Sequence, residues 1–207
     1  MEITNGYCTL DDVTAALRMG NDTNDDAAIE RAVEAASRLI DGYCGRHFYA
    51  DTVSARVFRA TNCNIVDVDD ISTLTGLVVA TDSSGDGTFD VTWSASDYQL
   101  EPLNGRRSGQ AWPYHTLRAV GSYDFPTYGT RGHEALVEVT AAWGWPAIPA
   151  AVVDACVIQT VSQFKAKDAP LGFAGFGDMG AMRMSATMHP TARTLLAPYR
   201  KHAVKVA

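Results

Sequence analysis

Residues 175–180, GFGDMG, carry glycines at the spacing G-x-G-x-x-G that can cradle the phosphates of a dinucleotide. A phosphate turn of this kind follows a buried strand, opens a helix and is followed about twenty residues later by an acidic residue for the ribose. Here a helical pattern and KDAP precede the glycines, and the last twenty-seven residues contain neither Asp nor Glu. We therefore expect no nucleotide site and no cofactor.

Residues 82–87, DSSGDG, have oxygen-bearing side chains at alternate positions, as the start of a calcium loop does. The position that should supply a bidentate Glu is Trp93, so the pattern breaks. We expect a hairpin turn here, because Asp and Gly favour tight turns between apolar runs. Cys44 and His47 have no second pair at zinc-site spacing, so no metal site is predicted.

Carboxylates cluster in residues 67–73, DVDDIST, and paired carboxylates can perform general acid-base catalysis. Beside a strand end such a cluster more often forms a solvated turn, which is the interpretation we favour. The motifs G-x-S-x-G, H-E-x-x-H and G-x-x-x-x-G-K-[ST] are absent, so no catalytic residue and no enzyme activity are predicted. A small hydrolase with a site dispersed over scattered His and Asp residues is the weakest alternative.

The charge of the chain is unevenly distributed. The formal net charge is -7, which argues against tight nucleic-acid binding through phosphate contacts. Residues 1–50 hold four basic and nine acidic side chains, residues 51–164 hold six and thirteen, and residues 165–207 hold seven and two. An acidic body with a basic end suggests pairing with an acidic surface, including one on a second copy, with a solvated unpaired tail as the alternative.

Helical signals occupy the N-terminal part of the chain. Thr9 and Asp12 have the spacing of a capping box, and Gly20 is placed to end a short first helix. A second helix is expected to run to about Tyr43, because apolar residues recur there at intervals of three and four. These apolar positions are Ile29, Val33, Ala36, Ile40 and Tyr43.

Residues 51–142 consist of short β-branched and aromatic runs separated by Gly, Asp, Asn and Ser, which predicts an antiparallel β lobe. A third helix is expected after Pro149, and a last short one around TARTLLAP. The predicted fold class is α+β: a small helical bundle built from residues 1–50 and 143–207, with residues 51–142 as an inserted lobe. The apolar stripe expected on the third helix comprises Val153, Cys156, Val157, Thr160 and Phe164.

The chain has no run approaching eighteen apolar residues and no basic and apolar signal-peptide pattern at its start. We expect a soluble protein made in a cytoplasm, with no membrane partner. The four cysteines form no C-x-x-C pair, and in a reducing compartment they are expected to be small buried hydrophobes rather than disulfides or metal ligands.

Two stretches resemble the head-tail connector, or adaptor, proteins of tailed bacteriophages. The first, YCTLDDVTAALRMGNDTNDDAAIERAVEAASRLIDGYCGRHF, resembles the family's N-terminal helical pair, and the second, VTAAWGWPAIPAAVVDACVIQTVSQFKAKDAPLGFAGFG, resembles its later helix. The β lobe between them is longer than the connection in compact members. The matching positions of the first stretch are Asp26, Ile29, Glu30, Ala35, Ala36, Ile40, Asp41, Tyr43, Gly45, Arg46 and Phe48.

The resemblance implies a structural virion protein made in the bacterial host cytoplasm and located in the neck. Its implied partners are further copies of itself in a ring expected to be dodecameric, the portal protein, and a stopper or tail-terminator protein. Double-stranded DNA is expected to pass through the ring without specific binding, which suits an acidic conduit.

The Gly- and Met-rich run and the basic end are predicted to dock on the portal or on a neighbouring subunit, because flexible Met-rich surfaces adapt to partners. The alternative is that these apolar side chains fold back over the β lobe. A different function class is a carbohydrate-binding module that uses exposed Trp93, Trp112 and Tyr114 as stacking platforms. The docking residues proposed are Phe173, Phe176, Met179, Met182, Met184, Met188, Arg193, Arg200, Lys201 and Lys205.

Overall fold

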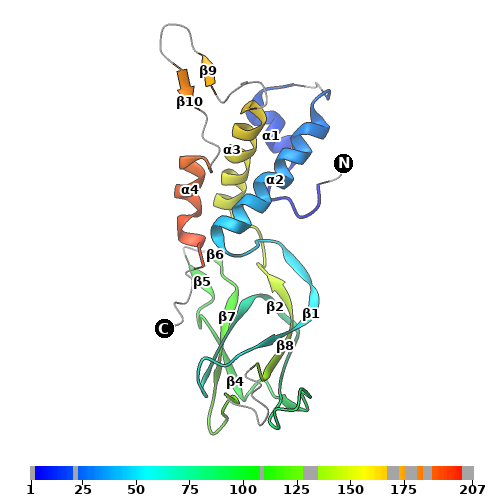
Figure 1. Cartoon of the computed structure of the whole chain (residues 1–207), viewed down its shortest axis with the longest axis vertical. Helices are drawn as coiled ribbons and strands as arrows, with labels where there is room; N and C mark the ends of the chain where they lie inside the picture. Colours follow the sequence, from blue (N-terminus) through cyan, green and yellow to red (C-terminus); the bar gives the residue numbers. More distant parts are fainter. Residues whose placement is uncertain are drawn as a thin grey trace. The chain divides into compact units, whose positions relative to one another are not determined.

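A computed structural model of the chain separates into two compact units (Figure 1). The helical unit consists of Met1–Phe48 and Ile148–Ala207, and the β unit consists of Tyr49–Ala147. Trp143 and Gly144, which the sequence assigns to the helical part, are the last residues of a β-strand. The structure describes residues 3–20, 23–107, 110–127, 135–166, 173–175, 181–183 and 188–201.

Four α-helices and a short hairpin make up the described part of the helical unit, which confirms the α+β class together with the sheet of the β unit. Helix α3 packs against α1, α2 and α4. The helices are α1 (Leu10–Leu17), α2 (Asp26–Cys44), α3 (Ala150–Ala166) and α4 (Pro190–Leu196), followed by the 3-10 helix η3 (Ala197–Tyr199).

The capping box predicted at the start of α1 is confirmed. The Thr9 hydroxyl accepts a hydrogen bond from the Asp12 amide at 3.1 Å, and the Asp12 carboxylate accepts one from the Thr9 amide at 2.8 Å. The predicted end of this helix at Gly20 is wrong, because Arg18 already leaves the helix in the left-handed region at φ 59°. Two successive amides, from Arg18 and Met19, bond back to carbonyls of the last turn and close it earlier.

The apolar face predicted for α2 is confirmed at Ile29, Val33, Ala36 and Ile40, which are fully buried, whereas Tyr43 is only half-buried. The face predicted for α3 is rotated. Cys156 and Thr160 are buried as expected, but the other buried positions are Val152, Ala155 and Gln159, and periodicity of large apolar residues does not reveal the small and polar ones. The buried residues of α3 are Val152, Ala155, Cys156, Gln159 and Thr160.

The glycine-rich segment contains two short strands, β9 (Phe173–Gly175) and β10 (Ala181–Arg183), paired antiparallel with Gly175 opposite Ala181. The sequence predicts only a loop here, because glycine has low β-propensity. Gly175, the first residue of GFGDMG, is therefore the last residue of β9, and β9 pairs with β10. In a dinucleotide-binding turn the glycines instead lead from a strand into a helix.

The β unit contains a six-stranded antiparallel sheet in the order β1-β8-β2-β7-β4, with β3 paired to β2. Its core is formed by the inner faces of β2 and β8 around the fully buried Trp143. The strands are β1 (Ala50–Phe58), β2 (Ile65–Thr81), β3 (Val91–Trp93), β4 (Tyr98–Glu101), β7 (Tyr114–Ala119) and β8 (Val137–Gly144), and a separate pair is β5 (Arg106–Arg107) with β6 (Gln110–Ala111).

The solvated turn predicted at DVDDIST is wrong, because residues 67–73 lie inside the seventeen-residue strand β2. Their carboxylates have structural partners instead of a turn. Asp67 accepts the Thr116 hydroxyl at 3.0 Å, Asp69 pairs with Arg56 at 2.7 Å, and buried Asp70 accepts the Trp145 indole N–H at 3.1 Å. The cluster therefore serves to hold β2 in place.

Candidate functional site

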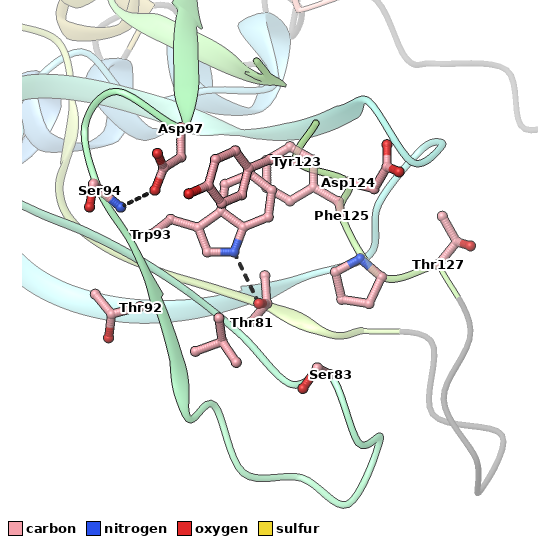
Figure 2. A pocket seen from close by; sticks show the side chains of 12 residues that line it. Thr81, Ser83, Thr92, Trp93, Ser94, Asp97, Tyr123, Asp124, Phe125 and Thr127 are labelled. Carbon is pink, nitrogen blue, oxygen red and sulfur yellow. Dashed lines mark hydrogen bonds between the residues drawn. The ribbon is translucent and has the colours of Figure 1, made fainter. Parts of the chain in front are cut away.

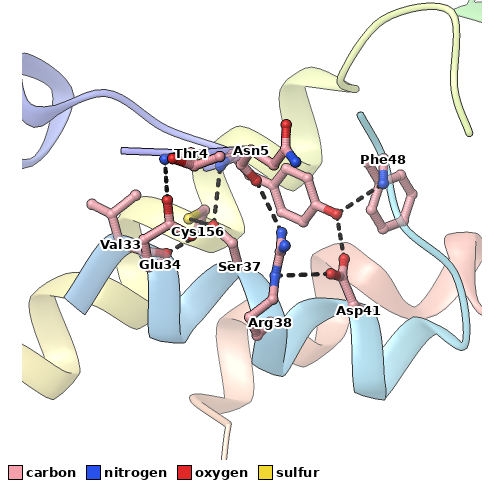
Figure 3. Close-up of polar contacts among 10 residues, drawn as sticks. Thr4, Asn5, Val33, Glu34, Ser37, Arg38, Asp41, Phe48 and Cys156 are labelled. Carbon is pink, nitrogen blue, oxygen red and sulfur yellow. Dashed lines mark hydrogen bonds and ion pairs between the residues drawn. The ribbon is translucent and has the colours of Figure 1, made fainter. Parts of the chain in front are cut away.

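The segment before α1 is fastened to α2 by a set of polar contacts that we call the N-terminal clamp, made by Thr4, Asn5, Tyr7, Glu34, Ser37, Arg38, Asp41 and Phe48 (Figure 3). At its centre the Tyr7 hydroxyl donates to the Asp41 carboxylate and accepts the Phe48 amide at 2.8 Å. Arg38 holds the same carboxylate from the other side, with its Nε 3.1 Å from an Asp41 oxygen.

Backbone groups of residues 4–7 complete the clamp. The Arg38 guanidinium donates to the Asn5 carbonyl at 2.9 Å, and the Glu34 carboxylate accepts the Thr4 amide. Ser37 is buried, and its hydroxyl accepts the Tyr7 amide at 3.0 Å. Because these three backbone groups find side-chain partners on α2, the chain can run across that helix without secondary structure of its own.

Burial decides the protonation chemistry of the clamp. It raises the pKa of the Tyr7 hydroxyl well above its usual range, and the hydrogen bond to Asp41 acts in the same direction. Burial also raises the pKa of Asp41, although the Tyr7 hydroxyl and the Arg38 charge oppose that shift. The pair is a part-buried hydrogen bond that fixes structure, with the Tyr7 ring buried and the Asp41 carboxylate held by Tyr7 and Arg38.

The C-terminal segment fastens to the C-terminal end of α2. Gly45 caps this helix at φ 66°, and the Lys201 amide donates to the Cys44 carbonyl at 2.7 Å. The ring of Phe48 lies between those of Tyr7 and Tyr199, with centroid distances of 5.6 and 5.9 Å in edge-to-face geometry.

Two of the predicted docking cations gather over one aromatic ring. The guanidinium groups of Arg193 and Arg200 lie 6.0 and 5.0 Å from the centroid of Tyr43, at the distance of cation–π contacts. Both arginines are exposed, as is Lys201 beside them. We call Tyr43, Arg193, Arg200 and Lys201 the basic cluster, which presents positive charge on an otherwise acidic chain.

The apolar docking residues have different positions. Met188 is 5% exposed, so it packs in the core of the helical unit instead of serving as a free anchor. Phe173 and Met182 belong to the paired strands β9 and β10. The remaining predicted anchors lie outside the described residues: Phe176, Met179, Met184 and Lys205.

The aromatic platform expected on the β lobe is wrong for its first member. Trp93 is 7% exposed, because its ring stacks on Phe125 at 4.3 Å and its N–H donates to the Thr81 hydroxyl at 3.1 Å (Figure 2). Trp112 packs on Trp145 at a centroid distance of 4.8 Å, and Tyr114 is half-buried. The three rings therefore do not form one exposed stacking surface.

A pocket of about 650 Å³ lies beside Trp93 and is lined mainly by polar side chains (Figure 2). Tyr123 is its exposed aromatic ring, 49% accessible, and Asp97 on its wall already accepts the Ser94 amide at 2.8 Å. A single exposed ring and internally paired polar groups do not define a ligand class.

The DSSGDG turn is confirmed as the connection of the β2–β3 hairpin. The Asp82 carboxylate occupies its centre and accepts amides from Gly85 at 2.6 Å, Asp86 at 3.3 Å and Gly87 at 2.7 Å. Within the described residues, no group of three or more His, Cys, Asp or Glu side chains could hold a metal ion. None of the helices there combines the length and apolar character needed to cross a membrane.

The structure defines a two-unit α+β protein. The polar side chains of its helical unit fasten the N-terminal and C-terminal segments to α2. Residues 7–81 match the family model "Phage gp6-like head-tail connector protein", which confirms the resemblance inferred from the first of the two stretches. No curated protein sequence matches the chain.

Two solved structures have a similar fold. The first is a chain of "Neck of empty GTA particle computed with C6 symmetry", with a TM-score of 0.57 and 18% identity, covering 100% of this chain and 96% of that one. The second is a chain of "Neck of native GTA particle computed with C12 symmetry", with a TM-score of 0.52, 17% identity and the same coverage. At these identities the likeness concerns the fold, which this chain shares over its whole length with the two neck chains.

The clamp explains several positions of the family-like stretch. Asp41, Gly45 and Phe48 are identified from the sequence, and the structure gives them a role in joining α2 to the two ends of the unit. Sequence reasoning missed Tyr7 and Ser37, which pair with residues about thirty positions away. A polar Ser on the buried face of α2 is the one local signal that could have indicated such a partner.

Proposed function

We propose that this chain is the head-tail adaptor of a tailed phage or phage-like particle. Copies form a ring between the portal and the stopper or tail terminator, continue the DNA conduit and complete the packaged head. The observation that carries the proposal is the connector-family match over residues 7–81, in a chain whose whole fold is similar to neck proteins. The chain acts by assembly and has no catalytic role.

The charge distribution supports a ring. Rings form through heterologous contacts, in which one face of a subunit meets a different face of the next. The acidic residues of α1 and α2 and the basic cluster are two unlike surfaces of one chain, so they can pair between neighbours. Twelve copies are expected from the family resemblance, and the acidic body lets DNA slide because it repels phosphate.

We assign docking on the portal or on a neighbouring subunit to residues 168–207, which carry the three cations of the basic cluster. A truncation after Lys167 is a poor test, because it removes α4, whose Ala192 and Leu196 are fully buried in the helical unit. The double variant Arg193→Glu, Arg200→Glu reverses two exposed charges and also removes their contacts with the Tyr43 ring, so circular dichroism first checks that it folds. The matched control is Arg31→Glu on the exposed face of α2.

The test uses portal-bearing heads that lack this chain, incubated with each purified variant and recovered by sedimentation. We expect the double variant to bind at least about tenfold more weakly, because two attractive contacts become repulsive. The control is expected to bind as the wild type does. Equal attachment of the double variant and wild type would remove the basic cluster from the docking surface.

The apolar anchors need a separate variant. Replacing Phe173, Phe176, Met179, Met182 and Met184 with Ser keeps Met188 and α4 in place. We expect this variant to fold, as judged by circular dichroism, and to lose attachment to heads. Full attachment would favour the alternative in which these side chains have no docking role.

The carbohydrate-binding alternative has less support. Its stacking platform required exposed rings at Trp93, Trp112 and Tyr114, and the first of these is in the core of the β unit.

A further inference from the structure

Two cysteines far apart in the sequence lie against each other in the helical unit. The Sγ atoms of Cys8 and Cys156 are 3.3 Å apart, although the residues are 148 positions apart. Cys8 immediately precedes the N-cap of α1, and Cys156 lies in the middle of α3. Both are free thiols with exposed fractions of 6% and 0%. A small further approach would bring the sulfurs to the disulfide bond length of about 2.05 Å.

The surroundings of Cys156 favour its thiolate. The Cys8 thiol donates to the Cys156 sulfur, and the hydroxyls of Ser37 and Thr160 lie 3.5 and 4.0 Å from it. These contacts lower the pKa of Cys156 to about 7, and the contact with Cys8 has the largest effect. The same contact and burial raise the pKa of Cys8. The pair therefore holds one nucleophilic sulfur and one thiol at contact distance.

We propose that Cys8 and Cys156 are a redox modification site that closes into an intramolecular disulfide when a hydroperoxide oxidises the pair. The Cys156 thiolate attacks one peroxide oxygen, the O–O bond breaks, and the departing hydroxide takes up a proton to become water. The Cys8 sulfur then attacks the Cys156 sulfenic acid. The S–O bond breaks and the released hydroxide takes the Cys8 proton, so two thiols and one peroxide give one disulfide and two waters.

The Cys8–Cys156 disulfide would reinforce the attachment of the N-terminal segment that the clamp already makes. Cys8 follows Tyr7, so a disulfide to α3 fixes covalently the segment that Asp41 and Ser37 hold by hydrogen bonds. The closed loop spans α1, α2 and the β unit, and loops of this length give the larger stabilisations expected of disulfides. The timing rests on the proposed function: in an assembled particle, the disulfide would form after the particle leaves the reducing cytoplasm.

The test treats the purified full-length protein with hydrogen peroxide at one equivalent, then maps its peptides without reduction. We expect a peptide pair joined through Cys8 and Cys156, and a midpoint of helix unfolding raised by about 5–10 °C that dithiothreitol reverses. The Cys63→Ser variant, which lacks an exposed thiol of the β unit, is expected to behave like the wild type. Cys8→Ser and Cys156→Ser are expected to lose the reversible increase.

The mapping of the wild type decides the question even if a Cys8 or Cys156 variant fails to fold. The proposal is overturned if both thiols remain open to alkylation after unfolding while Cys63 has been oxidised. It is equally overturned if the recovered cross-links join other cysteines. Because this measurement uses the isolated chain, its failure leaves the neck role untouched, and a failure of the neck role leaves the disulfide untouched.

Discussion

At the residue scale, the structure gives the carboxylate of Asp41, a position of the family-like stretch, a structural role. It accepts the Tyr7 hydroxyl and pairs with Arg38, so it joins the N-terminal segment to α2. The helical periodicity of the sequence predicts where Asp41 lies on α2. It does not predict the partner, because Tyr7 approaches from a stretch without regular structure.

Replacing Tyr7 with Phe removes the hydroxyl that contacts both Phe48 and Asp41, and it leaves the buried Phe48 amide and the half-buried Asp41 carboxylate without that partner. We expect the helical unit to lose about 1–3 kcal/mol of unfolding free energy, the usual penalty for orphaned buried polar groups. All four tryptophans lie in the β unit, so far-UV circular dichroism follows the helices while tryptophan fluorescence follows the β unit. Urea denaturation followed by both signals therefore separates the unfolding of the helical unit from that of the β unit.

The control for this substitution is Tyr123→Phe in the β unit, where the ring is 49% exposed. It is expected to leave the helical transition unchanged. A Tyr7→Phe protein whose helical transition matches the wild type would show that the clamp contributes nothing to stability.

The Asp82 carboxylate gives a pH dependence to the β unit. Burial raises its pKa, but the amide hydrogen bonds from Gly87 and Gly85 outweigh burial and hold the pKa below its ordinary value. An acid with a lowered folded pKa stabilises the fold above its unfolded pKa of about 3.9 and loses that contribution as the pH falls through the folded value. We expect fluorescence-monitored stability to fall below about pH 4.

Asp82→Asn should lack this part of the acid-induced loss. Asp90→Asn, at an exposed position of the same loop, is the control and should keep it. A variant at Asp82 that loses stability over this pH range as steeply as the wild type would contradict the assignment.

At the element scale, the sequence predicts the helices better than the strands. The apolar spacing and the terminal Gly45 define α2 almost to the residue, because both signals are local. Strand β2 is missed as one element, since three aspartates near its start look like a turn until Arg56, Thr116 and Trp145 supply their partners. Those partners come from elsewhere in the chain, so no local pattern contains them.

Two glycines of α2 are expected to respond with opposite sign to the same substitution. Gly42 is within the helix with open space around it, so Gly42→Ala should stabilise the helical unit by about 0.5–1 kcal/mol. Gly45 has φ 66°, where a side chain is strained, so Gly45→Ala should destabilise it by about 1 kcal/mol. Circular dichroism during urea unfolding measures both, and shifts of equal sign would refute the assigned end of α2.

At the scale of the whole molecule, composition indicates an acidic body and a basic end, but not which charges meet. The structure brings Arg193 and Arg200 to one ring, although Tyr43 lies about 150 residues earlier in the chain. That meeting depends on α2 and the C-terminal segment packing together, which the Lys201 contact to Cys44 accomplishes. The docking partner lies outside the chain, so neither periodicity nor spacing could indicate it.

Pairing of acidic and basic surfaces between copies predicts that the ring is sensitive to salt. Exposed charge pairs are screened over about 10 Å at 0.1 M salt and over about 3 Å at 1 M. We expect the ring fraction of the purified protein, measured by mass photometry, to fall as ionic strength rises. An unchanged ring fraction would mean that apolar contacts hold the ring.

The central claim, an adaptor ring in a virion neck, is tested most directly by electron cryo-microscopy of the neck with this chain traced in the density. The account predicts a closed ring, with twelve copies expected, between the portal and the stopper, and the basic cluster of each copy against a neighbour or the portal. A neck complete without this chain, or containing it only outside a ring, would contradict the account.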